Sequence, residues 1–140
     1  MLDKVLYSAS AKATGGRDGK AETLDGKVKL NLSVPKELGG DGGAGSNPEQ
    51  LFAMGYSACF LGAMRHVAGA EKVQLPADTS IEGNVGIGPI PNGFGIEVEL
   101  KIHVPNMDKS KVKEIVDKAH IVCPYSNATR NNIQVKLTVI

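Results

Sequence analysis

Residues 47–64 read NPEQLFAMGYSACFLGAM, and this stretch decides how the rest of the chain must fold. Its start has the features of a helix N-terminus, with Asn47 as N-cap, Pro48 at the first helical position and Gln50 where a capping box places a polar partner. From residue 51 to residue 64 the stretch is apolar on every side, which predicts a central helix that other segments enclose. A chain of 140 residues can hardly enclose such a helix alone, so we expect an obligate homodimer.

Alternating apolar and polar residues, the pattern of a half-buried strand, recur on both sides of this helix. The alternating segments are residues 5–13, 28–34, 81–87, 96–104 and 133–139. The first segment is the least regular and the fourth is the most regular, with His103 on its polar face, where we expect a solvated side chain. Pro91-Asn92-Gly93 predicts a turn between the third and fourth segments, because asparagine and glycine tolerate positive φ.

A second helix is predicted for residues 108–122, where apolar residues recur on one side and lysines on the other. Pro124 should end this helix. The resulting order of strands, helix, hairpin, helix and strand is not a regular alternation of parallel βαβ units. It favours an α+β fold with antiparallel sheets, in one domain that spans residues 1–140.

The composition is that of an ordinary globular protein, because hydrophobic residues make up 41% and charged residues 22% of the chain. The net charge of +1 and the lack of a basic block argue against binding to nucleic acid. The longest apolar run, residues 51–64, is too short to span a bilayer, and residues 1–7 lack the apolar core of a secretory signal. We therefore expect a cytoplasmic protein without nucleic-acid or membrane partners.

Two features that resemble ligand sites are better explained otherwise. Residues 40–45 match the spacing of the dinucleotide fingerprint G-x-G-x-x-G, but they lie in a glycine-rich loop, residues 39–46, with no parallel βαβ unit around them. No Lys-Ser or Lys-Thr pair follows, so a phosphate-binding P-loop is also excluded. The spacing of the histidines and cysteines matches no zinc motif, and we expect neither a metal nor another cofactor.

The two cysteines lie on helix faces that the patterns place inward, Cys59 in the middle of the apolar helix and Cys123 at the end of the amphipathic one. Each could be an ordinary core thiol. If the two meet, they join positions 64 apart, and a permanent bridge would stabilise the fold by about 4 kcal/mol in the chain-entropy model. Because the cytosolic thiol pool would reduce such a bridge, a reversible pair is the better interpretation.

A reactive Cys59 needs its pKa lowered from about 8.5. The helix dipole cannot do so, because Cys59 lies more than three turns from the helix start and the effect fades within the first turn. Arg17, in a glycine-flanked turn, is a candidate cation, and Glu49 could hold its guanidinium in a bidentate pair. From periodicity alone a solvated Arg17 remains the alternative, and Arg65 and Arg130 are rival cations.

These residues resemble a known family. Residues 47–60 and residues 120–130, which read HIVCPYSNATR, are similar to the two cysteine motifs of the organic hydroperoxide resistance proteins, the Ohr branch of the OsmC/Ohr family. Gly15-Gly16-Arg17 resembles the family's N-terminal arginine turn, and the glycine-rich loop also matches. The resemblance covers nearly the whole chain. It implies an OsmC/Ohr-like α+β fold, with antiparallel sheets wrapped around the central apolar helix in an intertwined homodimer.

The resemblance also implies an activity, that of a two-cysteine thiol peroxidase that reduces alkyl and lipid hydroperoxides to alcohols. Cys59 would attack the peroxide and become a sulfenic acid, and Cys123 would then close a disulfide with it. Dihydrolipoyl groups on partner proteins would reduce that disulfide, with no metal or nucleotide involved. Arg17 and Glu49 match the family's activating pair. An apolar pocket would suit the substrate's tail. The candidate lining residues, each equally plausible as core, are Phe52, Tyr56, Met64 and Tyr125.

Two questions stay open at the level of the sequence. The first is a departure from the family pattern, because Asn131 stands where a glycine is usual. We expect the turn to survive, since asparagine is the non-glycine residue best able to hold positive φ. The second is the choice between the peroxidase and two alternatives. One is a non-enzymatic binding dimer of the same fold, and the other is a redox-sensing regulator, which would need a DNA-binding element that the sequence does not show.

Overall fold

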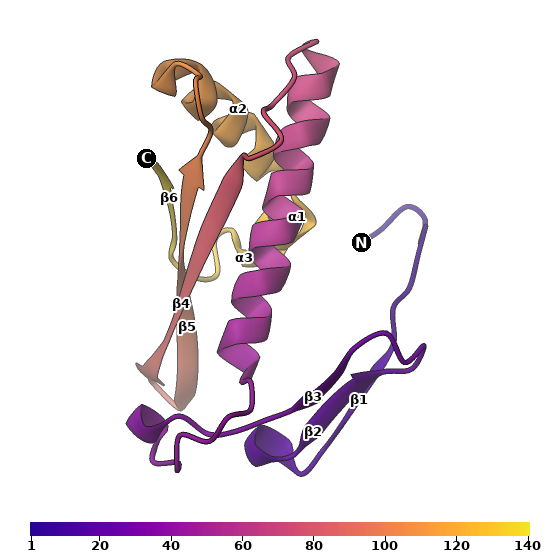
Figure 1. Ribbon diagram of the computed structural model, residues 1–140, viewed down its shortest axis with the longest axis vertical. Coiled ribbons are helices and arrows are strands. Elements are labelled where there is room, and N and C mark those ends of the chain that lie inside the picture. The colour runs from indigo at the N-terminus through magenta and orange to yellow at the C-terminus, as the bar shows by residue number, and fades with distance from the viewer. The chain divides into compact units, whose positions relative to one another are not determined.

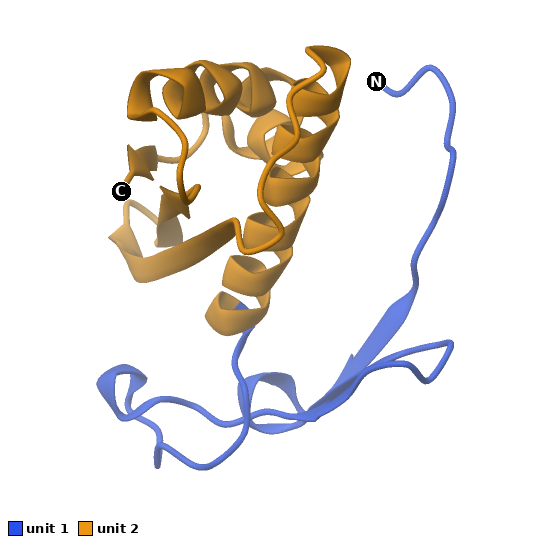
Figure 2. Cartoon of the chain, turned by 45° about the horizontal axis from the view of Figure 1, so that its top comes forward, with its two compact units in different colours: residues 1–48 blue, residues 49–140 orange.

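The computed structural model describes all 140 residues and separates the chain into two compact units, Met1–Pro48 and Glu49–Ile140 (Figure 2). Each unit has its own sheet of three strands. The single domain expected over residues 1–140 stays a prediction. No helix in the structure combines the length and the apolar character that crossing a membrane requires.

The first unit is an antiparallel meander. Its elements are β1 (Ala11–Thr14), the 3₁₀ helix η1 (Gly16–Asp18), β2 (Lys20–Thr23), β3 (Lys29–Asn31) and the 3₁₀ helix η2 (Lys36–Leu38). The turn between β1 and β2, which carries Arg17, depends on glycine. Gly15 has a φ of 76°, and a Cβ on Gly19 would lie 1.8 Å from the carbonyl oxygen of Thr14.

The strands of this unit are shorter than the alternation predicts. Residues 5–10 lie outside any strand, and the strand predicted for residues 28–34 covers only Lys29–Asn31. Beyond β3 the glycine-rich loop takes over the backbone pairing. The N–H of Ser46 donates to the carbonyl oxygen of Asn31, and the N–H of Ser33 donates to that of Ser46, both at 2.9 Å. The loop is thus tied to the end of β3 and belongs to no βαβ unit, as the sequence indicates.

The second unit contains three helices and one mixed sheet (Figure 1). β4 and β5 form a long antiparallel hairpin, and Asn92 in its turn has the predicted positive φ, 66°. β6 pairs with β5 in parallel, so the prediction of antiparallel pairing was wrong for this strand. α2 and α3 separate β5 from β6 in the chain and form the crossover that a parallel pair needs. The α+β class is confirmed. In chain order the elements are α1 (Pro48–Ala70), β4 (Ser80–Ile90), β5 (Gly93–His103), α2 (Lys109–Val122), α3 (Pro124–Thr129) and β6 (Val135–Val139).

α1 lies along the sheet of the second unit, as both ribbon views show (Figures 1 and 2). The approach is close because β4 has a glycine beneath the helix. A Cβ on Gly83 would lie 2.4 Å from Ser57 Oγ and 3.0 Å from the carbonyl oxygen of Ala53. The alternation of β5 places one set of its residues in the core, as predicted. These buried residues are Val98, Leu100, Ile102 and Val104.

One side of α1 stays outside this core. Tyr56, Phe60 and Met64 are 0% exposed, whereas Met54 is 58% exposed and Ala58 is exposed as well. Although the helix is apolar on every side, a single chain therefore encloses only part of it. The enclosure of the helix by a second copy of the chain stays a prediction.

The corner between α2 and α3 follows from three local signals. Asp108 caps α2 by accepting a hydrogen bond from the N–H of Ser110 at 2.8 Å. Pro124 ends α2, as predicted, and also starts α3, because proline suits the first position of a helix. Cys123 forms the joint, with an extended ψ of 123°. Asn131, just beyond α3, has a φ of 62°, which confirms that asparagine holds the turn in place of glycine.

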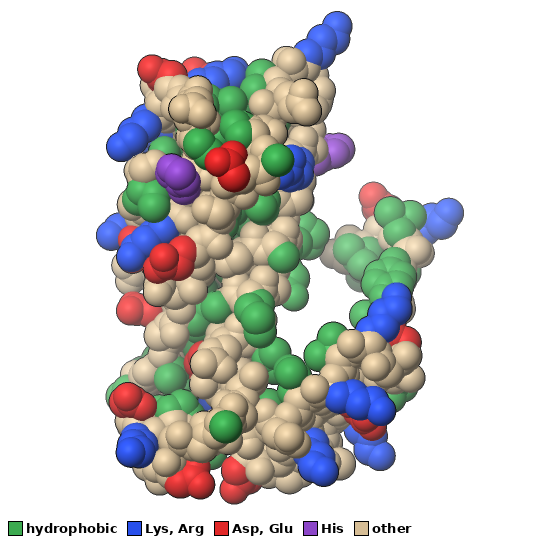
Figure 3. Space-filling view, in the orientation of Figure 1, with side chains coloured by type: hydrophobic (Ala, Val, Ile, Leu, Met, Phe, Trp, Pro, Cys, Tyr) green, Lys and Arg blue, Asp and Glu red, His purple; other side chains and the backbone are tan.

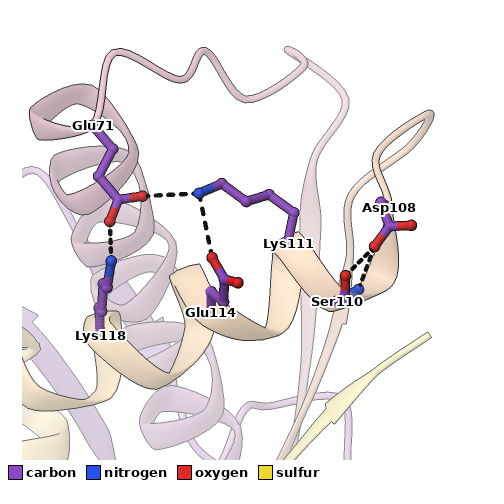
Figure 4. A network of polar contacts seen from close by, with 6 residues as sticks. All are labelled: Glu71, Asp108, Ser110, Lys111, Glu114 and Lys118. Atoms are coloured by element: carbon purple, nitrogen blue, oxygen red, sulfur yellow. Dashed lines mark hydrogen bonds and ion pairs between the residues drawn. The ribbon is translucent and has the colours of Figure 1, made fainter.

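A cluster of ion pairs joins the end of α1 to α2 (Figure 4). Glu71, the residue after α1, contacts Lys118 and, at 3.3 Å, Lys111. Lys111 also contacts Glu114 at 3.4 Å. The hydrogen bond from Lys118, and then that from Lys111, hold the pKa of Glu71 below its ordinary value of 4.5. The carboxylate is therefore charged at neutral pH and well into the acid range.

We predict that Glu71→Gln lowers the free energy of unfolding at neutral pH, and that this effect fades as the pH falls below the ordinary carboxyl pKa of 4.5. A depressed folded-state pKa gives stability that is complete above the unfolded-state pKa and is lost as the pH falls through the folded-state pKa. Urea unfolding of both proteins across this range measures the difference. Glu114→Gln is the control, because Glu114 contacts Lys111 and is the more exposed carboxylate. The same pH dependence in Glu71→Gln and the native chain would contradict this role.

Candidate active site

The structure brings together the two cysteines, Cys59 from α1 and Cys123 from the joint between α2 and α3. Their Sγ atoms lie 3.8 Å apart, with the thiol of Cys123 directed at Cys59. Both are free thiols. Since a disulfide bond is about 2.05 Å long, a movement of less than about 2 Å would join them.

The two sulfurs differ in their access to solvent. Cys59 is half-buried, whereas Cys123 is 0% exposed and belongs to the hydrophobic core. A reagent from solution can therefore reach Cys59 first, and Cys123 only after a local opening. This asymmetry distinguishes two thiols that the sequence places on similar inward faces.

Burial is the main influence on the reactivity of Cys59. It raises the pKa of the Cys59 thiol above its ordinary value of 9.0, and the neighbouring Cys123 raises it further. A hydrogen bond from the backbone N–H of Tyr125 acts in the opposite direction and lowers this pKa. Because burial is the largest of these effects, the thiol form is favoured until a positive charge offsets it.

An aromatic cluster includes Tyr125, whose backbone N–H donates to Cys59. The ring of Tyr125 lies 6.0 Å from that of Phe52 and 5.6 Å from that of Tyr56, measured between centroids. The Tyr125 ring can lie on α1 because a Cβ on Gly55 would come within 2.9 Å of its hydroxyl oxygen. Three of the four candidate lining residues are thus in contact with one another. Met64, the fourth, is fully buried in the core.

Tyr56 of this cluster also belongs to a network of buried, hydrogen-bonded hydroxyl groups. Tyr56 Oη lies 2.9 Å from Ser126 Oγ and 3.1 Å from Thr129 Oγ1, and Ser126 Oγ lies 2.9 Å from His120 Nδ1. Burial, and then the charge of Arg130, lower the pKa of His120, which favours its neutral form. These hydrogen-bonded hydroxyl groups were not predicted from the sequence. The available signal was spacing, because Tyr56 and Ser126 each lie three residues from a cysteine.

The candidate cations occupy different parts of the fold. Arg17 lies in η1 of the first unit, and Glu49 lies in the first turn of α1 in the second. Their pairing with Cys59 stays a prediction. Of the rivals, Arg130 donates to the carbonyl oxygen of His120 and to Asn127 Oδ1, and Arg65 is exposed. No three histidine, cysteine, aspartate or glutamate side chains lie together in a way that would hold a metal ion.

Comparison with known proteins shows the family of the chain. The family model described as OsmC-like protein matches residues 39–138. The chain belongs to the OsmC/Ohr family. The organic hydroperoxide resistance protein of Xanthomonas axonopodis pv. citri is 61% identical over 137 residues, which cover 98% of this chain and 96% of that protein. This similarity places the chain in the Ohr branch of the family.

Solved structures of Ohr-branch proteins share the fold. An organic hydroperoxide resistance protein from Legionella pneumophila matches with a TM-score of 0.91 and 50% identity, over 97% of this chain and 98% of that one. The organic hydroperoxide resistance protein OhrB of Bacillus subtilis matches with a TM-score of 0.89 and 40% identity, over 97% of this chain and all of that one. The OsmC/Ohr-like fold is thus confirmed, and membership of the Ohr branch supports a role in peroxide detoxification.

We predict that iodoacetamide modifies Cys59 of the folded protein at least about tenfold faster than Cys123, because only Cys59 is accessible. Peptide mass spectrometry after timed labelling measures both rates. In urea the difference should disappear. Equal rates in the folded protein would show that burial does not distinguish the two thiols.

Proposed function

We propose that this Ohr-branch chain is a two-cysteine thiol peroxidase that reduces organic hydroperoxides to alcohols, with Cys59 as the attacking thiol and Cys123 as the resolving thiol. The observation that carries the proposal is the 3.8 Å contact between one half-buried and one fully buried sulfur. A substrate from solution can reach the half-buried Cys59 sulfur. The buried Cys123 sulfur lies close enough to react with a sulfenic acid formed on Cys59. Relatives named for organic hydroperoxide resistance, at 61% and 50% identity, support the substrate class.

The reaction has two chemical steps and a regeneration. The Cys59 thiolate attacks the hydroperoxide, the O–O bond breaks, and one oxygen stays on sulfur as a sulfenic acid while the alkoxide leaves and takes up a proton. Cys123 then attacks the sulfenic sulfur, the S–S bond forms, and the hydroxyl leaves as water. A dithiol, which we propose to be of the dihydrolipoyl type, exchanges with the disulfide and restores both thiols.

The first step needs a cation, because burial raises the pKa of Cys59. We assign this role to Arg17, held by Glu49. An arginine keeps its charge in a buried site, and a carboxylate can fix its guanidinium in a two-pronged pair. The attraction between guanidinium and thiolate is stronger in an apolar enclosure than in water.

The aromatic cluster of Phe52, Tyr56 and Tyr125 supports an organic substrate rather than hydrogen peroxide. Tyr125 remains 38% exposed, so the cluster reaches the surface, and the backbone N–H of the same residue donates to Cys59. An alkyl or lipid tail gains by contact with such apolar surface, whereas hydrogen peroxide has no tail to place there. We include Met64 as a residue that supports this lining from within the core.

The functional form that we propose is a cytoplasmic homodimer. The exposed apolar side of α1, with Met54 and Ala58, is a surface that a second chain would cover. Figure 3 shows hydrophobic side chains along α1 on one face of the molecule. A dimer interface on this side of α1 would remove its exposed apolar side chains from water.

We predict that Cys59→Ser abolishes consumption of an alkyl hydroperoxide with dihydrolipoamide as reductant, because the one remaining thiol, Cys123, is fully buried. Cys123→Ser should allow one oxidation event and then stop with a sulfenic acid on Cys59. Steady-state kinetics and mass spectrometry measure both outcomes. Near-native turnover in Cys59→Ser would refute the assignment, and normal recycling in Cys123→Ser would refute the resolving role. A generic dithiol in place of dihydrolipoamide, and hydrogen peroxide in place of the alkyl hydroperoxide, are the controls for reductant and substrate class.

We also predict that Arg17→Ala raises the pKa of Cys59, because the charge that favours the thiolate is lost. The rate of alkylation against pH measures this value, and the curve should shift to higher pH. Arg17→Lys, which keeps the charge without the planar fork, should fall between Arg17→Ala and the native chain. A profile that does not move in Arg17→Ala would rule out Arg17 as the activating residue.

A further inference from the structure

Two contacts tie α1 to the corner between α2 and α3, and they lie one helical turn apart. The first is the contact between the sulfurs of Cys59 and Cys123, at 3.8 Å. The second is the hydrogen bond between Tyr56 Oη and Ser126 Oγ, at 2.9 Å. Tyr56 lies three residues before Cys59, and Ser126 lies three residues after Cys123. The same two segments are therefore joined twice, and the proposed reaction uses only the sulfur contact directly.

Ser126 also fixes the bend at Cys123. His120 Nδ1 lies 2.9 Å from Ser126 Oγ, and these two residues stand three positions on either side of Cys123. Their hydrogen bond spans the change of direction between α2 and α3. Arg130 strengthens the same corner by donating to the carbonyl oxygen of His120. The place of the Cys123 sulfur thus depends on hydrogen bonds made around it.

The hydrogens of this network can be ordered so that each hydroxyl donates once. Thr129 Oγ1 donates to the carbonyl oxygen of Ser126 at 3.3 Å, which leaves Tyr56 Oη to donate to Thr129 at 3.1 Å. Ser126 then donates to Tyr56 and accepts from His120. Tyr56 and Ser126 are 0% exposed, so water cannot replace a lost partner. The network therefore resists any separation of α3 from α1.

We propose that Tyr56, Ser126 and His120 are positioning residues that hold Cys123 in register with Cys59 and thereby set the rate of disulfide closure. This inference rests on the proposed function, in which Cys123 must reach a sulfenic acid on Cys59. Closure brings the sulfurs from 3.8 Å to about 2.05 Å, a movement that stays small only while α3 keeps its place on α1. A misplacement of about 1 Å between reacting groups can slow a reaction about a hundredfold.

Slow closure would also expose Cys59 to a second oxidation. A sulfenic acid that no thiol captures can react with another hydroperoxide, which transfers one oxygen to the sulfur and leaves as an alcohol. The product is a sulfinic acid, which thiols do not reduce. The positioning network thus protects the enzyme from inactivation by its own substrate.

The first test measures the geometry without any peroxide. The protein is equilibrated with reduced and oxidised glutathione, and the fraction with a Cys59–Cys123 disulfide gives the effective concentration of the pair. Tyr56→Phe and Ser126→Ala each remove one hydroxyl, and each should lower this value about tenfold. The double variant should lower the value by less than the product of the two single effects, because both variants remove the hydrogen bond between Tyr56 and Ser126. Unchanged values would overturn the proposal.

Two further variants separate positioning from general stability. His120→Asn keeps a polar atom near the place of Nδ1 and should retain the native value, whereas His120→Leu should lower it. Val67→Ala is the matched control, because it removes core volume about 12 Å along α1 from Cys59. An equal fall in Val67→Ala would mean that lost stability explains the effect, and the proposal would be wrong.

The second test follows the oxidation steps by stopped-flow kinetics with an alkyl hydroperoxide. In Ser126→Ala the sulfenic acid on Cys59 should form at the native rate, and disulfide closure should be about tenfold slower. Mass spectrometry should then find more sulfinic acid on Cys59 at high peroxide concentration. Native closure with native sulfinic acid levels would overturn the positioning role. Turnover by Cys59→Ser would instead refute the proposed peroxidase activity. The glutathione equilibrium tests the positioning role independently, because it involves no peroxide.

Discussion

The close packing of α1 against its neighbours in the second unit is the contact on which the candidate site depends. Glycines make it possible on two sides of the helix. Gly83 lets β4 approach the helix backbone, and Gly55 leaves room for the ring of Tyr125. Because α3 packs closely on α1, the sulfur of Cys123, just before α3, lies 3.8 Å from that of Cys59 on α1. A Cβ at Gly55 would press on the ring of Tyr125, and a Cβ at Gly83 would press on Ser57 and on the backbone of α1 at Ala53.

The same enclosure creates an electrostatic conflict. Burial hides Cys123 from solvent and shapes an apolar surface beside Cys59, but it also raises the pKa of Cys59 and so favours the less reactive thiol form. The backbone N–H of Tyr125 offsets part of this effect. A buried thiol needs a positive charge beside it to favour the thiolate, which is the physical reason for the arginine in the mechanism that we propose.

Polar groups in the core of the second unit are few and fully paired. No buried side-chain nitrogen or oxygen in the structure lacks a hydrogen-bond partner. Each hydroxyl in the chain of Tyr56, Ser126 and Thr129 has a partner within that chain or at His120. Because such bonds have a fixed geometry, they define the spacing of two elements more sharply than apolar contact does. The proposed closure of a disulfide between Cys59 and Cys123 would benefit from this fixed spacing.

The sequence by itself determined the features that depend on neighbouring residues. The start of α1 at Pro48, the turn at Asn92, the cap of α2 at Asp108 and the positive φ of Asn131 all follow from the chemistry of a few adjacent positions. The cysteine motifs also led to the correct family. The predicted strands at residues 5–13 and 28–34 were too long, because alternation shows which residues can pair but not where a partner is present.

Only the tertiary structure decided the features that join distant parts of the chain. These are the parallel pairing of β6 with β5, the separation of the two sulfurs, the different burial of Cys59 and Cys123, and the hydrogen bond between Tyr56 and Ser126. The residues of the two helix contacts lie 64 and 70 positions apart. No local pattern encodes such a distance, because it is the packing of whole helices and strands that sets it.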